Sequence, residues 1–339
     1  LLSKHTIMKK NAQQRRDLSL VVSILAFLCW GLVSCNKPLL KTGEGNLPVS
    51  GGKIWYKVSG NGTGIPVVLI HGGPGASSFY LKPFEELGND RQVIRYDQLG
   101  SGKSTYTEDT TMFTIEQRVT ELDSLRKALG INTWNLLGHS FGTMVALEYY
   151  AAFPDHVVSL IFAGPCFDVP AYEENCRLLL KTLPDSLQKA VAEADSSSDY
   201  INLRYQDALT MFNDLYGSRK PDRVETDSIM ATFNVVLNYY MLGPSDISII
   251  GTLKDYNSTP YLSKIRVPTL FTVGEFDTSG PQLVKSFSEQ VAGSEYYVFP
   301  NSAHITMWDA EEENVRVVRN FLLSADACIQ SVSGSNQNR

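Results

Sequence analysis

The residues with the clearest chemical signature are Gly138-His139-Ser140-Phe141-Gly142, which form a G-x-S-x-G pattern. In this pattern a sharp turn between a strand and a helix raises the serine hydroxyl above a sheet, and the glycines permit the crowded backbone. An apolar strand-like stretch precedes the pentapeptide and an apolar helix-like stretch follows it, as the turn requires. We therefore expect Ser140 to be a nucleophile, with the backbone N–H of Phe141 as one donor to an oxyanion.

A serine nucleophile needs a histidine as base and a carboxylate to orient that histidine, in the chain order Ser, acid, His. Of the five histidines, His304 alone lies C-terminal to Ser140 in a loop after an expected strand, so it is the predicted base. The carboxylate should follow the preceding strand, where Asp277 is preferred and Glu275 is the alternative. The glycine-rich segment 71–75 follows the first buried strand and can present backbone N–H groups to the oxyanion.

These residues lie where expected strands end, within a regular alternation of strands and helices. Such an alternation predicts a mostly parallel sheet with helices on both faces. Between residues 166 and 260 the alternation stops and the sequence becomes helix-like, which indicates a helical insertion. The expected strands are 53–59, 66–70, 91–96, 132–137, 157–163, 267–273 and 295–299, and the expected helices are 114–129, 141–153 and 311–323.

Five segments together resemble the proline iminopeptidases, and more closely their tricorn-interacting type: HGGPG at 71–75, RYDQLGSGKS at 95–104, GHSFGT at 138–143, GEFD at 274–277 and SAHITMW at 302–308. The resemblance covers roughly residues 50–323 and implies an α/β-hydrolase fold with an inserted helical cap. It implies a serine aminopeptidase, without cofactor or metal, that releases proline or another N-terminal residue from short peptides with a free N-terminus. It assigns the triad to Ser140, Asp277 and His304, and the oxyanion donors to Gly73 and Phe141.

Two cap segments resemble those whose acids bind the α-amino group of the substrate in this family. The resemblance places Asp207 and Asp246 there, with Tyr200 as a hydroxyl partner and Glu173 or Glu174 as alternatives. Both aspartates are one methylene shorter than the glutamates expected at these positions, so the amine would be held differently or less tightly. The competing interpretation is that both are solvated or helix-capping residues, because aspartate is a favoured cap.

Two other functions remain open at this point. An esterase or amide hydrolase of the same fold would use the same triad on another acyl group. A lipoprotein that has kept the fold without activity is disfavoured by the complete triad and the glycines of the oxyanion loop. The net charge of −6 over 339 residues argues against a nucleic-acid partner.

The first 35 residues are typical of an export signal. Basic residues precede an apolar run at 18–33, which is too short for a membrane span but suits a secretory signal. The run ends in Leu32-Val33-Ser34-Cys35, which resembles the lipobox of bacterial lipoproteins, and this resemblance implies that Cys35 is lipidated and becomes the mature N-terminus. We therefore expect an exported lipoprotein, anchored to a membrane of a bacterial cell envelope on its periplasmic or surface face.

The expected organisation follows from these segments. It comprises a leader at 1–34, a lipid-attached spacer at 35–50, a hydrolase core at 51–165 and 261–323, a helical cap at 166–260 and a tail at 324–339. The remaining cysteines show no spacing typical of a metal site. Cys166 and Cys176 either pair in an oxidising compartment or are two buried thiols.

The lipobox predicts a specific effect of Cys35→Ala. Without the acceptor thiol the chain should reach the soluble fraction or remain an unprocessed precursor, whereas the parent chain should fractionate with membranes. Cell fractionation and gel mobility measure both outcomes. A Cys35→Ala chain that fractionates and migrates like the parent would show that Cys35 is not a lipidation site.

Overall fold

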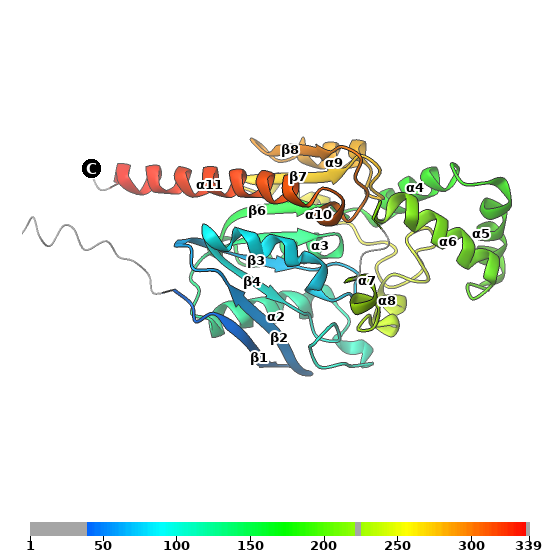
Figure 1. Cartoon of the computed structure of the whole chain (residues 1–339), viewed down its shortest axis with the longest axis horizontal. Helices are drawn as coiled ribbons and strands as arrows, with labels where there is room; N and C mark the ends of the chain where they lie inside the picture. The colour runs from blue at the N-terminus through cyan, green and yellow to red at the C-terminus, as the bar shows by residue number, and fades with distance from the viewer. Residues whose placement is uncertain (1–38, 221–224, 337–339) are drawn as a thin grey trace, which may run out of the picture. The chain divides into compact units, whose positions relative to one another are not determined.

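An eight-stranded sheet forms the centre of the structure, a computed structural model that describes residues 39–220 and 225–336 (Figure 1). Its strand order is β1-β2-β4-β3-β5-β6-β7-β8. The β1–β2 and β2–β4 pairs are antiparallel, and all other neighbouring strands are parallel. The strands are β1 Gly43–Val49, β2 Gly52–Ser59, β3 Gly64–Ile70, β4 Arg91–Tyr96, β5 Trp134–His139, β6 Val157–Ala163, β7 Thr269–Gly274 and β8 Glu295–Phe299.

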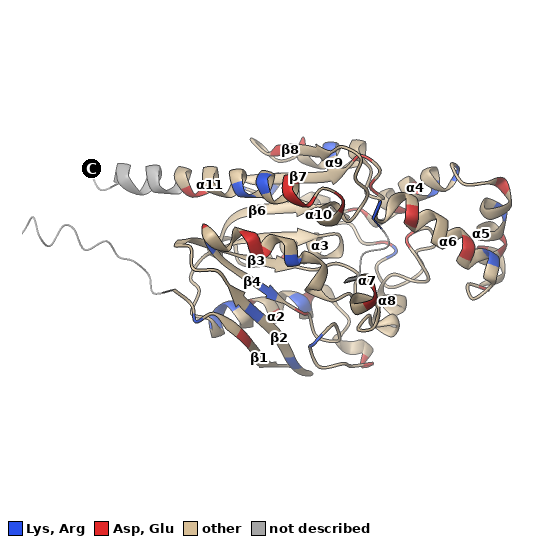
Figure 2. Cartoon of the chain, in the orientation of Figure 1, with Lys and Arg blue, Asp and Glu red and all other residues tan. Residues whose placement is uncertain are grey.

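Helices cover both faces of this sheet, as expected from the alternation in the sequence. Alternate residues of β3 enter two different clusters of buried side chains, Val68 and Ile70 one cluster and Val67 and Leu69 the other. The central strands β6 and β7 are buried along their whole length and carry no charged residue (Figure 2). Burial on both faces explains their continuous apolar sequences. The first cluster includes residues of α2 Ile115–Ala128, α3 Phe141–Ala152 and α9 Pro281–Ser288, and the second residues of η1 Ser78–Asn89, α10 Thr306–Asp309 and α11 Glu311–Asn336.

A helical segment interrupts the sheet domain between β6 and β7 and lies at the end of the sheet where the parallel strands finish (Figure 1). Helices therefore occupy the predicted insertion. They are α4 Val169–Leu180, α5 Asp185–Ser197, α6 Leu203–Tyr216, α7 Glu225–Met230 and α8 Val235–Met241. The 3₁₀-helix η4 Thr259–Lys264 leads back to the core. The core also contains the short 3₁₀-helices η2 Thr110–Met112 and η3 Pro154–His156. We call residues 166–260 the cap.

Two predicted boundaries are wrong. The spacer expected at 35–50 includes β1, whose seven residues pair with β2 in the sheet. Leu47 and Val49 are half-buried against the core between exposed neighbours, so the apolar alternation of this edge strand is only two residues long, and Pro48 is tolerated at such an edge. The tail expected from residue 324 instead continues α11 to Asn336, where Ala325 is buried and Asp326 forms an ion pair with Arg91.

Cys166 and Cys176 are not joined by a disulfide bond. Cys166 and Cys176 are buried, which favours the second of the two interpretations, and burial raises the pKa of both thiols. In the described ranges no group of side chains could hold a metal ion. No helix within those ranges is long and apolar enough to cross a membrane. The leader and Cys35 lie outside the described residues.

Candidate active site

Ser140 occupies the sharp turn between β5 and α3. Its backbone dihedrals are φ 54° and ψ −126°, in a region that residues other than glycine rarely adopt. The flanking glycines make this turn possible, because a Cβ on Gly142 would collide with the carbonyl oxygen of Ile70 and one on Gly138 with that of Gly142. The sequence pattern G-x-S-x-G is therefore a packing requirement, and it presents the Ser140 side chain at the carboxyl end of the parallel strands.

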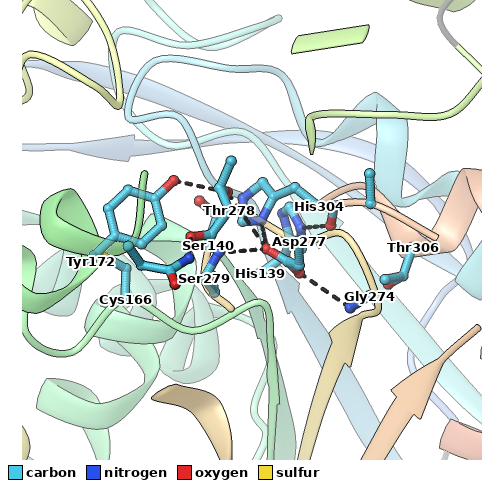
Figure 3. Close-up of polar contacts among 12 residues, drawn as sticks. His139, Ser140, Cys166, Tyr172, Gly274, Asp277, Thr278, Ser279, His304 and Thr306 are labelled. Carbon is cyan, nitrogen blue, oxygen red and sulfur yellow. Dashed lines mark hydrogen bonds and ion pairs between the residues drawn. The ribbon is translucent and has the colours of Figure 1, made fainter. Parts of the chain in front are cut away.

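The predicted base and acid meet at the same edge of the sheet. Asp277 follows β7 and His304 follows β8, and His304 Nδ1 lies 2.6 Å from Asp277 Oδ1 (Figure 3). The Asp277 carboxylate also accepts hydrogen bonds from the backbone N–H groups of Ser279, at 2.8 Å, and Gly274, at 3.3 Å. Glu275, the alternative acid, instead accepts a hydrogen bond from the backbone of Asn301. Asp277 is thus the carboxylate that orients His304.

The charges of this pair are set by burial and by mutual attraction. Burial disfavours the imidazolium, but the carboxylate of Asp277 and, further away, that of Asp246 hold the pKa of His304 above its ordinary value. Burial likewise disfavours the carboxylate, but the hydrogen bond and charge of His304 keep the pKa of Asp277 below its ordinary range. Asp277 is therefore ionised whenever His304 takes up a proton, which stabilises the form that a general base reaches during catalysis.

Hydrogen bonds of His71 shape the loop after β3, where the oxyanion donor Gly73 is predicted. His71 Nε2 accepts a hydrogen bond from the backbone N–H of Gln98 at 3.0 Å, so its proton is on Nδ1, which donates to the Gly72 carbonyl at 2.9 Å. In a trans peptide the carbonyl and the next N–H point in opposite directions. The bond from His71 therefore directs the N–H of Gly73 away from His71, and Gly73 lines the same cavity as Ser140.

His71 and Gln98 support the oxyanion loop, and the sequence did not reveal this pair. Gln98 also donates from its side chain to the carbonyl oxygen of His71, at 2.8 Å, so two hydrogen bonds join the loop after β3 to the loop after β4. Both residues stand in motifs that resemble the family, HGGPG and RYDQLGSGKS, but their partnership spans 27 residues. The sequence showed that both motifs are present, but it did not show that they contact each other.

A cavity of about 360 Å³ lies between the core and the cap and is lined by Ser140, His304 and Gly73. Apolar side chains form much of its remaining wall. They include Leu209, Phe212, Ile229, Phe233 and Leu242 from the cap and Trp308 from α10. The site is therefore a small chamber whose reactive groups come from strand ends and whose shape comes from the insertion.

The cavity receives one of the two predicted amine-binding aspartates. Asp246 lines it, and burial raises the pKa of this carboxyl against the attraction of His304 and the Tyr172 hydroxyl. Asp207 instead lies exposed on α6, because the buried face of that helix is formed by Tyr205, Ala208 and Phe212. The placement expected for Asp207 is therefore wrong for this structure.

The other predicted partners of the amine also lie elsewhere. Tyr200 packs its ring against Tyr205, with ring centroids 5.3 Å apart, and is not part of the cavity wall. Glu173 forms an ion pair with Arg177 at 2.9 Å, and Glu174 is exposed. Asp246 is thus the one carboxylate among the predicted amine-binding residues that the structure brings to Ser140.

The geometry predicts the effect of removing the nucleophile. Ser140→Ala should lose on the order of 10⁴-fold in turnover, because no other group at the turn can form the acyl intermediate. Circular dichroism and a thermal melt should show an unchanged fold, since alanine differs only by the hydroxyl. A folded Ser140→Ala protein that keeps its turnover would contradict the assignment.

The pKa shifts predict the pH profile. The base must be neutral to act, and the pKa of His304 is raised. The midpoint of the acid limb of kcat/KM should therefore lie above pH 6.5, the ordinary histidine value. Asp277→Asn should leave only the more distant Asp246 to oppose burial, which lowers the pKa of His304 and moves this acid limb to lower pH. Turnover should also fall about 10⁴-fold. Steady-state rates from pH 4 to 9 measure both effects, and an unmoved limb would contradict the electrostatic account.

Comparison with known proteins places this site in a family. A model of the α/β hydrolase fold matches residues 65–203. The proline iminopeptidase of Heyndrickxia coagulans is 34% identical over 285 residues, which cover 83% of this chain and 99% of the relative, and that of Saccharolobus solfataricus is 33% identical over 286 residues, which cover 82% and 92%. A crystal structure of the proline iminopeptidase of Mycobacterium smegmatis matches with a TM-score of 0.78 at 26% identity, covering 85% of this chain and 100% of the other. Because the first two relatives are more than 30% identical over most of both chains, the chain belongs to the proline iminopeptidase family of α/β hydrolases.

Proposed function

We propose that this protein is a serine aminopeptidase that releases an N-terminal residue, proline or another, from short peptides. The observation that carries the proposal is the position of Asp246, a half-buried carboxylate in the wall of the cavity that holds Ser140 and His304. The charged groups that act on Asp246 are His304 and Asp277, and neither is a permanent cation. A substrate ammonium group would supply the missing positive charge through a charge-assisted hydrogen bond.

The chemistry is acyl transfer through Ser140. His304 takes the Ser140 proton as Oγ attacks the carbonyl carbon of the first residue, and Asp277 holds the imidazole and stabilises the imidazolium. The N–H groups of Gly73 and Phe141 stabilise the oxyanion. His304 then protonates the leaving amine, the C–N bond breaks and an acyl-enzyme remains. A water molecule, deprotonated by His304, releases the residue and restores Ser140.

The cap explains why cleavage would be limited to the first residue. Its apolar residues line the cavity of about 360 Å³ that holds Ser140 and His304, so the first residue of a substrate would lie against them. Asp246 sets the distance from the free amine to the scissile carbonyl. The apolar wall suits a side chain without charge, such as the proline ring.

An esterase or amide hydrolase is the second candidate function. It is favoured by one specific observation, namely that Asp207 does not reach the cavity, so the amine site contains a single predicted carboxylate. Such an enzyme would use the same triad and oxyanion donors on a substrate without a free amine. The two functions differ in whether a blocked amine abolishes hydrolysis.

We also propose that a lipid on Cys35 anchors the enzyme to a bacterial envelope membrane, as a periplasmic or surface protein. The support is the basic start, the short apolar run and the Leu-Val-Ser-Cys ending of the leader. Because β1 begins at Gly43, the spacer between such a lipid and the sheet domain would be at most seven residues, 36–42, and the enzyme would act close to the membrane.

The amine site predicts a difference between two aspartates of the cap. Asp246→Asn should raise KM for unblocked aminoacyl p-nitroanilides about 10-fold or more, because the ammonium loses its charged partner. Asp207→Asn is the matched control, and this exposed residue should leave KM unchanged. N-acetylated substrates should be poor for the parent enzyme and insensitive to either change. Efficient hydrolysis of N-acetylated substrates by the parent would favour the esterase or amidase function instead.

A further inference from the structure

A chain of buried hydrogen bonds joins the oxyanion loop, the nucleophile turn and the loop of the base. The backbone N–H of Gly72 donates to the Tyr80 hydroxyl at 2.6 Å, and that hydroxyl lies 2.9 Å from His139 Nδ1. On the other side of the ring, His139 Nε2 lies 3.0 Å from the carbonyl oxygen of His304. Tyr80 and His139 are 5% and 3% exposed, so solvent does not compete for these bonds.

The partners fix the position of every proton in this chain. A carbonyl oxygen can only accept, so His139 Nε2 carries a proton toward His304. Burial lowers the pKa of His139 to about 3, so the ring is neutral and its Nδ1 is an acceptor. The Tyr80 oxygen accepts from Gly72 and therefore donates its own proton to His139 Nδ1. The resulting order is Gly72 N–H to Tyr80, Tyr80 O–H to His139, and His139 N–H to the His304 carbonyl.

This chain holds the backbone of the catalytic base from one side, and the cap holds it from the other. The backbone N–H of His304 donates to the carbonyl oxygen of Tyr216 at 3.0 Å, and that of Ile305 to Gly217 at 2.8 Å. The ring of His139 also packs against that of His304, with centroids 4.6 Å apart (Figure 3). Both polar groups of the His304 main chain are therefore committed, which leaves the side chain few positions.

We propose that Tyr80 and His139 are positioning residues that hold the base and the oxyanion loop in register with Ser140. Neither residue transfers a proton to the substrate. Their bonds set where His304 and the peptide before Gly73 lie relative to the nucleophile, which sits directly after His139 in the chain. A displacement of about 1 Å between such groups can cost on the order of 100-fold in rate. The inference rests on the proposed acyl transfer through Ser140 but not on the choice of substrate.

Three variants of the full chain test this role. Tyr80→Phe removes the hydroxyl that joins Gly72 to His139, and His139→Met replaces the ring by an apolar chain without a donor. Both should lower kcat about 10- to 100-fold because the catalytic groups are displaced, and KM should change much less than kcat although both residues also line the cavity. His139→Gln, of the same length as methionine but with an amide donor, should recover most of the loss. Tyr106→Phe, at an exposed tyrosine, is the control and should behave like the parent.

The readouts separate this proposal from the proposed function. Rates are measured with prolyl p-nitroanilide and with p-nitrophenyl acetate, and both should fall in parallel in Tyr80→Phe and His139→Met. A parent protein that a fluorophosphonate does not label would refute Ser140 as a nucleophile, whatever the variants do. Folded Tyr80→Phe and His139→Met proteins with parental kcat, or a Gln variant no better than Met, would overturn the positioning role.

A measurement on the parent protein keeps the test independent of how the variants fold. In a sample labelled with ¹⁵N at histidine, His139 should remain a neutral ring with its proton on Nε2 between pH 5 and 8. His304, by contrast, should titrate above pH 6.5. Observation of a protonated Nδ1 on His139 in that range would overturn the proposed order of donors.

Discussion

The packing of the Ser140 turn against the end of β3 is the constraint on which the rest of the site depends. The backbone conformation of Ser140 costs on the order of 1–3 kcal/mol and persists only when its surroundings enforce it. Here α3 approaches the Ile70 carbonyl so closely that Gly142 has no room for a Cβ. Because β3 continues directly into the oxyanion loop, the same contact sets the separation of nucleophile and oxyanion donor. A Cβ on Gly72 would lie only 2.8 Å from that of Ser140.

Three histidines, the buried His71 and His139 and the half-buried His304, serve this site in different ways, and their surroundings decide which one can act as a base. Burial keeps His71 and His139 neutral, and each ring donates from one nitrogen and accepts at the other within the protein. Only His304 has a carboxylate in direct contact, so its pKa rises where those of the other two fall. His71 and His139 thus stay neutral and hold neighbouring groups by hydrogen bonds, whereas His304 can take up a proton. The contact with Asp277 causes this difference.

The sequence predicted those parts of the structure that leave a local pattern. Strands buried on both faces read as continuous apolar runs, and the triad followed from chain order and strand ends. β1 was missed because Leu47 and Val49 are its only apolar residues, and its glycines and proline are typical of a spacer. Asp207 was misplaced because the resemblance gave its position along the chain but not the face of α6 on which it lies. Tyr205 is on the buried face, and two residues turn the helix by about 200°, so Asp207 points away from that face. The hydrogen bonds between His71 and Gln98 join residues 27 positions apart, so no local sequence pattern predicts them.

The bonds from the loop of the base to the carbonyls of Tyr216 and Gly217 bear on how this enzyme can evolve. An inserted cap would be an exchangeable module if it touched the core through side chains alone. Here the end of α6 is part of the support of His304, so a foreign cap grafted between β6 and β7 would have to reproduce that backbone turn or lose the base. Adaptation to new substrates is therefore easiest at α7, which contributes Ile229 and Met230 to the chamber through side chains. Selectivity and the support of the catalytic base thus reside in different helices of one insertion.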